Sequence, residues 1–241
     1  MRFTLPRGTV LAFALLAALA FSITSSAGDD FKPEPGYSSL FNGKDLTGWK
    51  YYKETDLTGK TETADKRFRV VDGIIVAEEG KGIKDLYTLK PFNTEFNLKM
   101  EFRASLKSDS GVYVRGPQLQ VRDFIRRNEM KHLKKFKNDD WNELDITVKN
   151  GVVTTIVNGK ALTEKDTLHL IVANGKPVAD LNGKTVDINK IEVSVGAVAK
   201  CLCNGEFMEN MKIPLTSKQG IGLQAELGKF EFRRIRIKEM P

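Results

Sequence analysis

Hydrophobic and polar residues alternate strictly through residues 96–103 (FNLKMEFR). A period of two predicts a strand with one buried and one open face. The same alternation returns in residues 112–115 (VYVR) and 118–122 (QLQVR), and Gly116-Pro117 separates these two segments. Because proline has no backbone donor, this pair predicts a break between strands. The region is therefore expected to form consecutive strands of a sheet.

The open face of these strands carries side chains with paired donors and acceptors. If the strands are sheet neighbours, the polar residues share one surface that suits the hydroxyls of a sugar. A solvated outer face of an antiparallel sheet is the alternative interpretation, and the alternation alone does not decide between the two. The residues expected on this face are Glu101, Arg103, Tyr113, Arg115, Gln118 and Gln120.

The rest of the chain repeats strand and turn signals. Asp72-Gly73 between two short apolar segments predicts a hairpin, and so do three Asn-Gly pairs in residues 151–205. In the last segment, residues 230–237, the alternation changes phase around Arg233-Arg234, which is typical of a β-bulge. No long helical period occurs in the sequence. The predicted fold is all-β, a two-sheet antiparallel sandwich.

The first residues have the pattern of an export signal. Arg2 and Arg7 precede an apolar run over residues 10–21, and small residues end at Ala27. The run is shorter than the roughly 20 apolar residues that span a bilayer. We therefore expect residues 1–27 to be a cleaved signal peptide and residues 28–241 to be one domain. The expected location is secreted or periplasmic, with no membrane association after cleavage.

The net charge is modestly positive, and much of it lies in one segment. The formal charge of +7 falls to +5 without Arg2 and Arg7. Residues 126–137 (RRNEMKHLKKFK) form a basic run that suits nucleic acid or an anionic polysaccharide. A solvated loop or short helix over the sheet is the interpretation we favour, since an exported protein meets little nucleic acid. We expect no nucleic-acid partner; the sequence does not indicate an oligomeric state.

Cysteine and histidine offer little chemistry in this chain. Cys201 and Cys203 are neighbours on one face of an expected strand, where a disulfide is strained, so two buried free thiols are expected. His132 and His169 have no ligand at metal-binding spacing. Spacing alone assembles neither a Ser-His-Asp nor a Cys-His system. These residues therefore make no cofactor certain, and whether a divalent metal ion is bound stays open.

Several motifs are spread over about residues 37–240. They are SLFNGKDLTGW at residues 39–49, Glu101-Phe102-Arg103, Ser110-Gly111-Val112, Arg115-Gly116, Trp141-Asn142, Asn158-Gly159, Gly220-Ile221-Gly222-Leu223-Gln224 and Phe232-Arg233-Arg234-Ile235-Arg236-Ile237. Together these motifs resemble the 3-keto-disaccharide hydrolase family, also known as domain of unknown function 1080. The resemblance implies a concanavalin A-like jelly roll, export and action on oxidised glycosides.

The chemistry implied by this family starts from an acidic C2 hydrogen beside a C3 ketone. Its removal and the loss of the C1 substituent, followed by addition of water, need a general base and a group that holds the enolate oxygen. The resemblance implies Glu101 as the base or as ligand of a divalent metal ion. Arg103 and Arg115 are expected to hold the enolate or sugar hydroxyls, and Tyr113 to donate a proton or to stack.

The chain departs from the family pattern at two places. Gln118 stands where relatives often carry a glutamate, so it is expected only to bind. Glu226 lies near the place of a frequent histidine and is the substitute base or ligand. The remaining expected substrate-binding residues are Gln120, Asp123 and Gln224.

The sequence also bears on three alternative functions: a β-glucanase, a carbohydrate-binding module and a structural protein of the cell surface. A retaining β-glucanase needs paired carboxylates on one strand, and its Glu-x-Asp-x-x-Glu signature is absent. A non-catalytic carbohydrate-binding module is the main alternative, with Trp49, Tyr51, Tyr52 and Trp141 as stacking surfaces. A structural cell-surface protein is the third class. A polar cleft that holds Glu101 beside an arginine favours the sugar-directed functions.

Overall fold

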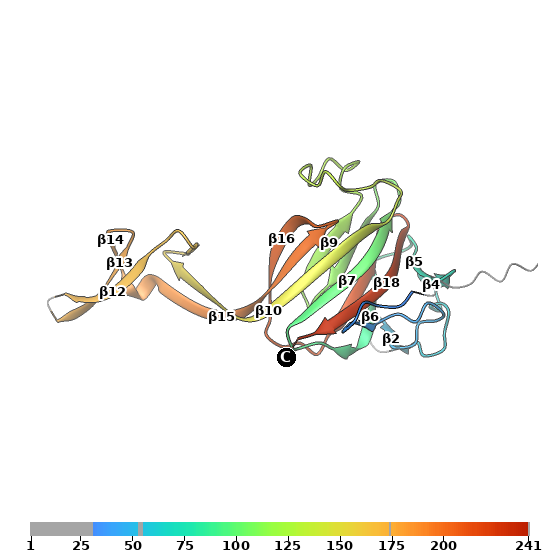
Figure 1. Ribbon diagram of the computed structural model, residues 1–241, viewed down its shortest axis with the longest axis horizontal. Coiled ribbons are helices and arrows are strands. Elements are labelled where there is room, and N and C mark those ends of the chain that lie inside the picture. The colour runs from blue at the N-terminus through green and yellow to red at the C-terminus, as the bar shows by residue number, and fades with distance from the viewer. Residues whose placement is uncertain (1–30, 53–54, 174, 241) are drawn as a thin grey trace, which may run out of the picture.

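The computed structural model of the protein describes residues 31–52, 55–173 and 175–240. The expected signal peptide lies outside these residues. Two large antiparallel sheets make up the body, as Figure 1 shows. One sheet has nine strands and the other has six. This arrangement confirms the predicted all-β, two-sheet antiparallel jelly-roll class.

The strands are numbered in chain order. In the nine-stranded sheet they are β1 (Ser38–Ser39), β4 (Phe68–Val71), β5 (Ile74–Ala77), β7 (Phe96–Ala104), β10 (Asn142–Val157), β11 (Lys160–Ala161), β15 (Ile191–Cys203), β16 (Glu206–Ile213) and β18 (Phe230–Glu239). In the six-stranded sheet they are β2 (Trp49–Tyr51), β3 (Thr55–Asp56), β6 (Lys84–Pro91), β8 (Asp109–Tyr113), β9 (Gln118–Arg122) and β17 (Gly220–Ala225). A three-stranded sheet holds β12 (Leu168–Ala173), β13 (Lys176–Leu181) and β14 (Lys184–Val186), and a short 3-10 turn covers Ile188–Lys190. The nine-stranded sheet has the order β16-β15-β10-β7-β18-β5-β4, with β1 on β18 and β11 on β10, and the six-stranded sheet has the order β3-β2-β6-β17-β8-β9.

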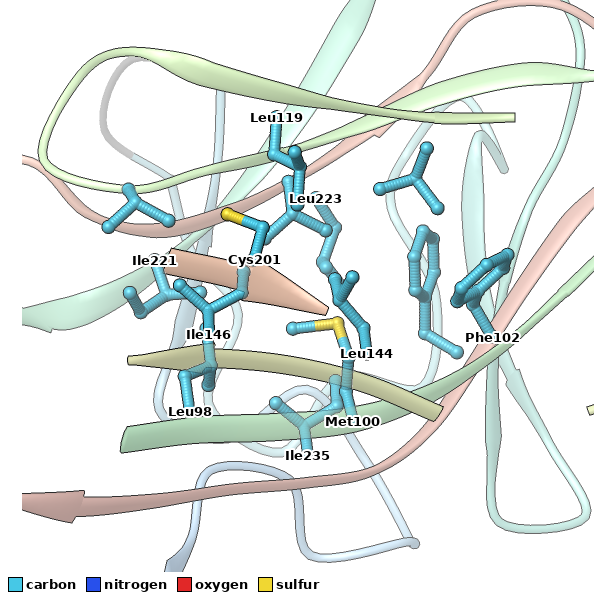
Figure 2. Packing of buried hydrophobic residues seen from close by; sticks show 14 of the residues in the cluster. Leu98, Met100, Phe102, Leu119, Leu144, Ile146, Cys201, Ile221, Leu223 and Ile235 are labelled. Carbon is cyan, nitrogen blue, oxygen red and sulfur yellow. The ribbon is translucent and has the colours of Figure 1, made fainter. Parts of the chain in front are cut away.

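The inner faces of the two large sheets form one core. In β7 the alternation is exact, with every second residue fully buried from Phe96 to Ala104. Figure 2 shows Leu98 and Met100 of the nine-stranded sheet packed in one cluster with Leu119 and Leu223 of the other. Burial of each such side chain stabilises the fold by roughly 1.5–3 kcal/mol. The strand pattern thus fixes which face of each sheet points inward.

The predicted turns are present. Asp72-Gly73 joins β4 to β5, and both residues have positive φ, 50° and 76°. The three Asn-Gly pairs, at residues 158, 182 and 204, also have positive φ at both positions, as type I′ hairpins require. In β18 the register against β7 shifts between Arg233 and Arg236, which confirms the predicted bulge. Cys201 and Cys203 are buried free thiols, as expected.

An arm, residues 152–196, extends from the sandwich. The first half of β10 pairs with β7 and β15, whereas its second half, from Val152, pairs with β15 and, at its end, with β11. Figure 1 shows the three-stranded sheet at the far end of this ribbon, away from the body. Along the ribbon Val153, Val193 and Val195 are more than half exposed. The arm therefore contributes little to the main core.

The basic segment after β9 is a series of turns without a helix. Phe124 and Leu133 anchor it in the core, and Phe136 packs against it. Its arginines are paired: Arg126 with Asp123 and Asp139, and Arg127 with Asp109 and Glu129. These internal pairs support the interpretation of a loop over the sandwich edge.

Strand β10 allows a matched test of the core. Ile146→Ala removes a fully buried side chain and should lower the free energy of unfolding by about 2–5 kcal/mol. Val153→Ala, on the same strand at 61% exposure, should change it by about 0.5 kcal/mol or less. Urea denaturation of both variants measures the difference. Equal losses would contradict the assignment of core and arm.

Candidate functional site

The outer face of the six-stranded sheet gathers polar side chains from four neighbouring strands. On β6 and β17 the inward residues Leu86 and Leu223 are fully buried, so the residues next to them point outward. The register then aligns the outward side chains, because Gln224 pairs with Asp85 and Gly222 lies between Tyr87 and Tyr113. We call this group the Asp85 cluster: Asp85, Tyr87, Tyr113, Gln118, Gln120 and Gln224.

A chain of hydrogen bonds runs across the cluster in one direction. Gln120 donates to the side-chain oxygen of Gln118 at 3.3 Å. Gln118 donates to Gln224 Oε1 at 2.7 Å, and Gln224 donates to the Tyr113 hydroxyl at 2.7 Å. Because the Tyr113 oxygen accepts this bond, its own hydrogen is available to the nearby Asp85, whose pKa Tyr113 helps to lower. The chain thus ends beside a carboxylate.

Two tyrosines flank that carboxylate. Tyr87 donates to Asp85 Oδ2 at 3.4 Å, a long contact. The rings of Tyr87 and Tyr113 lie 5.5 Å apart, centroid to centroid, at an interplanar angle of 44°. Burial is the main cause that raises the pKa of both phenols, that of Tyr113 to about 12, so both are protonated donors at neutral pH.

The cluster holds two acceptors that lack a donor. Asp85 Oδ1 and Gln120 Oε1 are buried, and no residue in the described part of the chain donates to them. A buried polar atom left without a partner costs roughly 1–3 kcal/mol. Both atoms are hydrogen-bond acceptors, and the hydroxyls of a sugar are donors of the kind they lack. The free acceptors therefore favour a ligand with several donors.

Asp85 is the titratable group best suited to proton transfer in this cluster. Burial raises the pKa of its carboxyl above the usual range, and hydrogen bonds from Tyr113 and Tyr87 partly oppose the shift. When ionised, such a carboxylate is a stronger base than a solvated one. The neighbouring glutamines cannot take up a proton, so they can only orient a ligand.

Two glycines leave space for the side chains of the cluster to lie close against the sheet. A Cβ at Gly222 would lie 2.4 Å from Tyr87 Cε1 and 2.8 Å from Tyr113 Cδ2. A Cβ at Gly111 would lie 1.9 Å from Gln118 Nε2. All three distances are shorter than a van der Waals contact. The tyrosines and Gln118 can therefore lie flat over the sheet only because these two positions have no side chain.

Charged groups lie at one end of the cluster. Glu226 follows β17 and is half-buried; burial, then the nearby Asp109, raises the pKa of its carboxyl. Asp109 accepts from Arg122 Nε at 2.7 Å.

Asp123, expected to bind substrate, is fully buried in the structure. Its Oδ2 accepts from the Lys107 amide at 2.7 Å and from Arg126 Nε at 2.6 Å. Asp123 thus stabilises the loop.

Glu101 and Arg103 lie on the opposite side of the molecule. Both belong to β7 and point outward from the nine-stranded sheet. Glu101 accepts from Arg233 Nε at 2.7 Å and from Arg234 Nη1 at 2.9 Å, so both of its oxygens are engaged. Arg103 pairs with Glu231 and stacks over the Trp141 ring at 4.8 Å, beside a surface hollow of about 270 Å³.

Arg115 is part of neither outer face. It is 2% exposed, and its guanidinium donates to the carbonyls of Phe92 and Thr94 at 2.8 and 2.6 Å. It also donates to Asn150 Oδ1 at 2.7 Å and to the Pro214 carbonyl at 3.3 Å. These bonds tie loops together, and burial lowers the pKa of Arg115.

The prediction that these polar residues share one face is therefore wrong. Residues 105–108 lead from β7 in one sheet to β8 in the other, so side chains on the two strands point to opposite surfaces. Glu101 and Arg115 do not share a cleft. The structure does bring four expected ligands together, namely Tyr113, Gln118, Gln120 and Gln224, and places Glu226 at their edge.

Asp85 and Tyr87 are not among the site residues expected from the sequence. They stand in the segment KDLYTL, where Leu86 is the buried residue between them. The alternation in this segment was the available signal, but nothing in it indicates that β6 lies beside β17 rather than beside β7.

The described residues contain no group of three or more His, Cys, Asp or Glu arranged to hold a metal ion.

Comparison with known proteins gives a family match over most of the chain. The family model described as a 3-keto-alpha-glucoside-1,2-lyase-like domain matches residues 36–238. No curated protein gives a significant match to the sequence. Among the described residues, none belongs to a helix long and apolar enough to cross a membrane.

Solved structures of low sequence identity resemble the chain. A candidate glycosyl hydrolase from Parabacteroides distasonis is 16% identical at a TM-score of 0.44, with 85% of this chain and 99% of that chain covered. The carbohydrate-binding module CBM66 of Bacillus subtilis is 11% identical at 0.34, with 80% and 96% covered. A Bacillus licheniformis β-glucanase is 10% identical at 0.36, with 85% and 97% covered.

Substitution of Gly222 tests the close approach of Tyr87 and Tyr113 to the backbone at this position. Gly222→Ala forces the two tyrosines apart and should lower the free energy of unfolding by about 1–3 kcal/mol. Gly196→Ala is the matched control, because a Cβ there meets no atom within 4 Å, and it should be neutral or stabilise slightly. Chemical denaturation measures both. A loss at Gly196 equal to that at Gly222 would contradict the close approach.

Proposed function

The chain belongs to the family of 3-keto-alpha-glucoside-1,2-lyase-like domains, and we propose that it cleaves 3-keto-glycosides at the Asp85 cluster by elimination and hydration. The single observation that carries the proposal is the cluster itself: a half-buried carboxylate between two tyrosines, beside amides that orient a ligand. We further propose that the protein acts after export, for which the pattern of residues 1–27 is the support.

The reaction has two steps. A base removes the hydrogen from C2 of the sugar, and the electron pair forms the enolate of the C3 ketone. The enolate then expels the C1 oxygen, which takes up a proton, and leaves a double bond between C1 and C2. Water adds across this bond, with its oxygen at C1 and a hydrogen at C2. The products are a 3-keto sugar and the released alcohol.

Asp85 fits the role of the base in this scheme. Its Oδ1 accepts no hydrogen bond from the described residues, so the lone pairs of this oxygen are not committed to a protein donor. Its raised pKa makes it a stronger base than a solvated aspartate. Glu101 fits less well, because two arginines occupy its oxygens.

The tyrosines fit the roles of hydrogen-bond donors. Both phenols stay protonated at neutral pH because burial raises each pKa, so they can stabilise an enolate oxygen without losing their hydrogen. Gln224 fixes the Tyr113 hydroxyl at 2.7 Å. The half-buried Glu226, at the edge of the cluster, is the candidate proton donor to the leaving oxygen, since burial also raises its pKa.

A second candidate is carbohydrate binding without catalysis. The observation that favours it is the share of amides in the cluster, since Gln118, Gln120 and Gln224 bind but cannot transfer a proton. In that case Asp85 would be only an acceptor for a sugar hydroxyl. Binding and turnover of the same sugar, measured side by side, distinguish the two.

Asp85→Asn is the direct test of the proposed base. It preserves the shape of the side chain and should reduce the release of glucose from a 3-keto-disaccharide by about 10²–10⁴-fold, with binding retained. Glu101→Gln is the control, because its side chain lies on the opposite sheet, and it should keep near-normal turnover. Loss of turnover in Glu101→Gln with normal turnover in Asp85→Asn would reverse the site assignment.

The pH dependence provides a further expectation. Asp85 acts when ionised, so kcat/KM should rise with pH through a pKa above the usual aspartate value of about 3.9. A raised native pKa also means that the folded state holds the proton more tightly than the unfolded chain. The contribution of Asp85 to stability is therefore lost as pH rises through that range, and Asp85→Asn should not lower Tm at neutral pH. A kcat/KM profile without an acid limb, together with a large fall in Tm, would contradict this role.

A further inference from the structure

Strand β12 is an edge strand with little protection. In the three-stranded sheet it pairs with β13 on one side, and no strand of the described residues lies on the other. Its sequence is LHLIVA, and Leu170, Ile171 and Val172 are 66%, 50% and 76% exposed. It carries no lysine, proline or bulge, which are the devices that keep natural edge strands from pairing. An edge of this kind is expected to be covered by another strand.

The hydrogen-bond pattern shows which groups point to the open edge. The Thr167 carbonyl accepts from the Asn182 amide at 3.0 Å, so Thr167 faces β13 with its backbone groups. Antiparallel strands alternate between residues that bond to the partner and residues that do not. The backbone N–H and C=O groups of Leu168, Leu170 and Val172 therefore point away from β13.

We propose that β12 pairs antiparallel with β12 of a second copy of the chain, with the two-fold axis at Leu170. In this register Leu170 lies opposite Leu170 of the other copy, and Leu168 lies opposite Val172. Every outward backbone donor and acceptor of these residues then finds a partner. The pairing is closed and self-complementary, as a two-fold interface requires.

The charges around β12 agree with a second copy as the occupant. The strand has no charged residue, so its own copy meets no repulsion and an acidic or basic peptide meets no attraction. Outside the strand, Glu164, Lys165 and Asp166 precede β12 and Lys176 opens β13, so both signs of charge stand at the ends of the proposed pair. Figure 1 shows β12 at the far end of the arm, away from the sandwich, so pairing at β12 does not require contact between the two sandwich bodies.

A cysteine at the axis is the sharpest test. In a hydrogen-bonded antiparallel pair, opposite Cα atoms are about 5.5 Å apart, within the range of a disulfide. Leu170→Cys should therefore form a covalent dimer under mild oxidation. Val172→Cys is the matched control, since it faces Leu168 and should not link to itself. Wild-type Cys201 and Cys203 are buried, so they should not link either.

Leu170→Pro separates pairing from folding. The N–H of Leu170 points outward, so proline there removes a donor from the open edge but keeps the ladder to β13. We expect a wild-type dimer by light scattering and a monomer for Leu170→Pro with an unchanged circular dichroism spectrum. Leu106→Lys, at a 64% exposed apolar position of the body, should stay dimeric. A monomeric wild type over the whole concentration series, or equal cross-linking at Leu170→Cys and Val172→Cys, would overturn the proposal.

Discussion

Burial of two inner sheet faces is the constraint on which the structure depends. Side chains of a strand alternate between its faces, so each strand that gives Leu or Phe to the core must show its other residues on the outside. In β7 this rule puts Phe102 inside and Glu101 outside. Because packed sheets lie about 10 Å apart, the two outer faces are separated by the whole thickness of the sandwich.

The two outer faces consequently have different chemistry. On the nine-stranded sheet, Glu101 and the arginines form ion pairs that satisfy one another. On the six-stranded sheet, glycines at 111 and 222 leave room for long side chains to lie flat, and Asp85 keeps an acceptor without a donor among the described residues. An arrangement with unsatisfied acceptors costs stability and favours a ligand, whereas one of closed ion pairs does not.

Local features of the fold could be predicted from the sequence, and the assignment of strands to sheets could not. The Asn-Gly hairpins, the bulge at Arg233-Arg234 and the buried cysteines follow from residue types and spacing. The connection at residues 105–108 looks like a hairpin turn but crosses between sheets, which separates Glu101 from Tyr113. Asp85 was missed for the same reason, since its neighbour Gln224 is far away in sequence and only the register of β6 with β17 brings them together.

The central claim is that the six-stranded sheet carries a base that removes the C2 hydrogen of a 3-keto-glycoside. Turnover in D₂O, with the released 3-keto sugar analysed by mass spectrometry and NMR, tests it most directly, against the uncatalysed exchange measured without enzyme. Elimination and hydration predict deuterium at C2 in every product molecule. Product that retains its original C2 hydrogen, at undiminished turnover, would contradict the account.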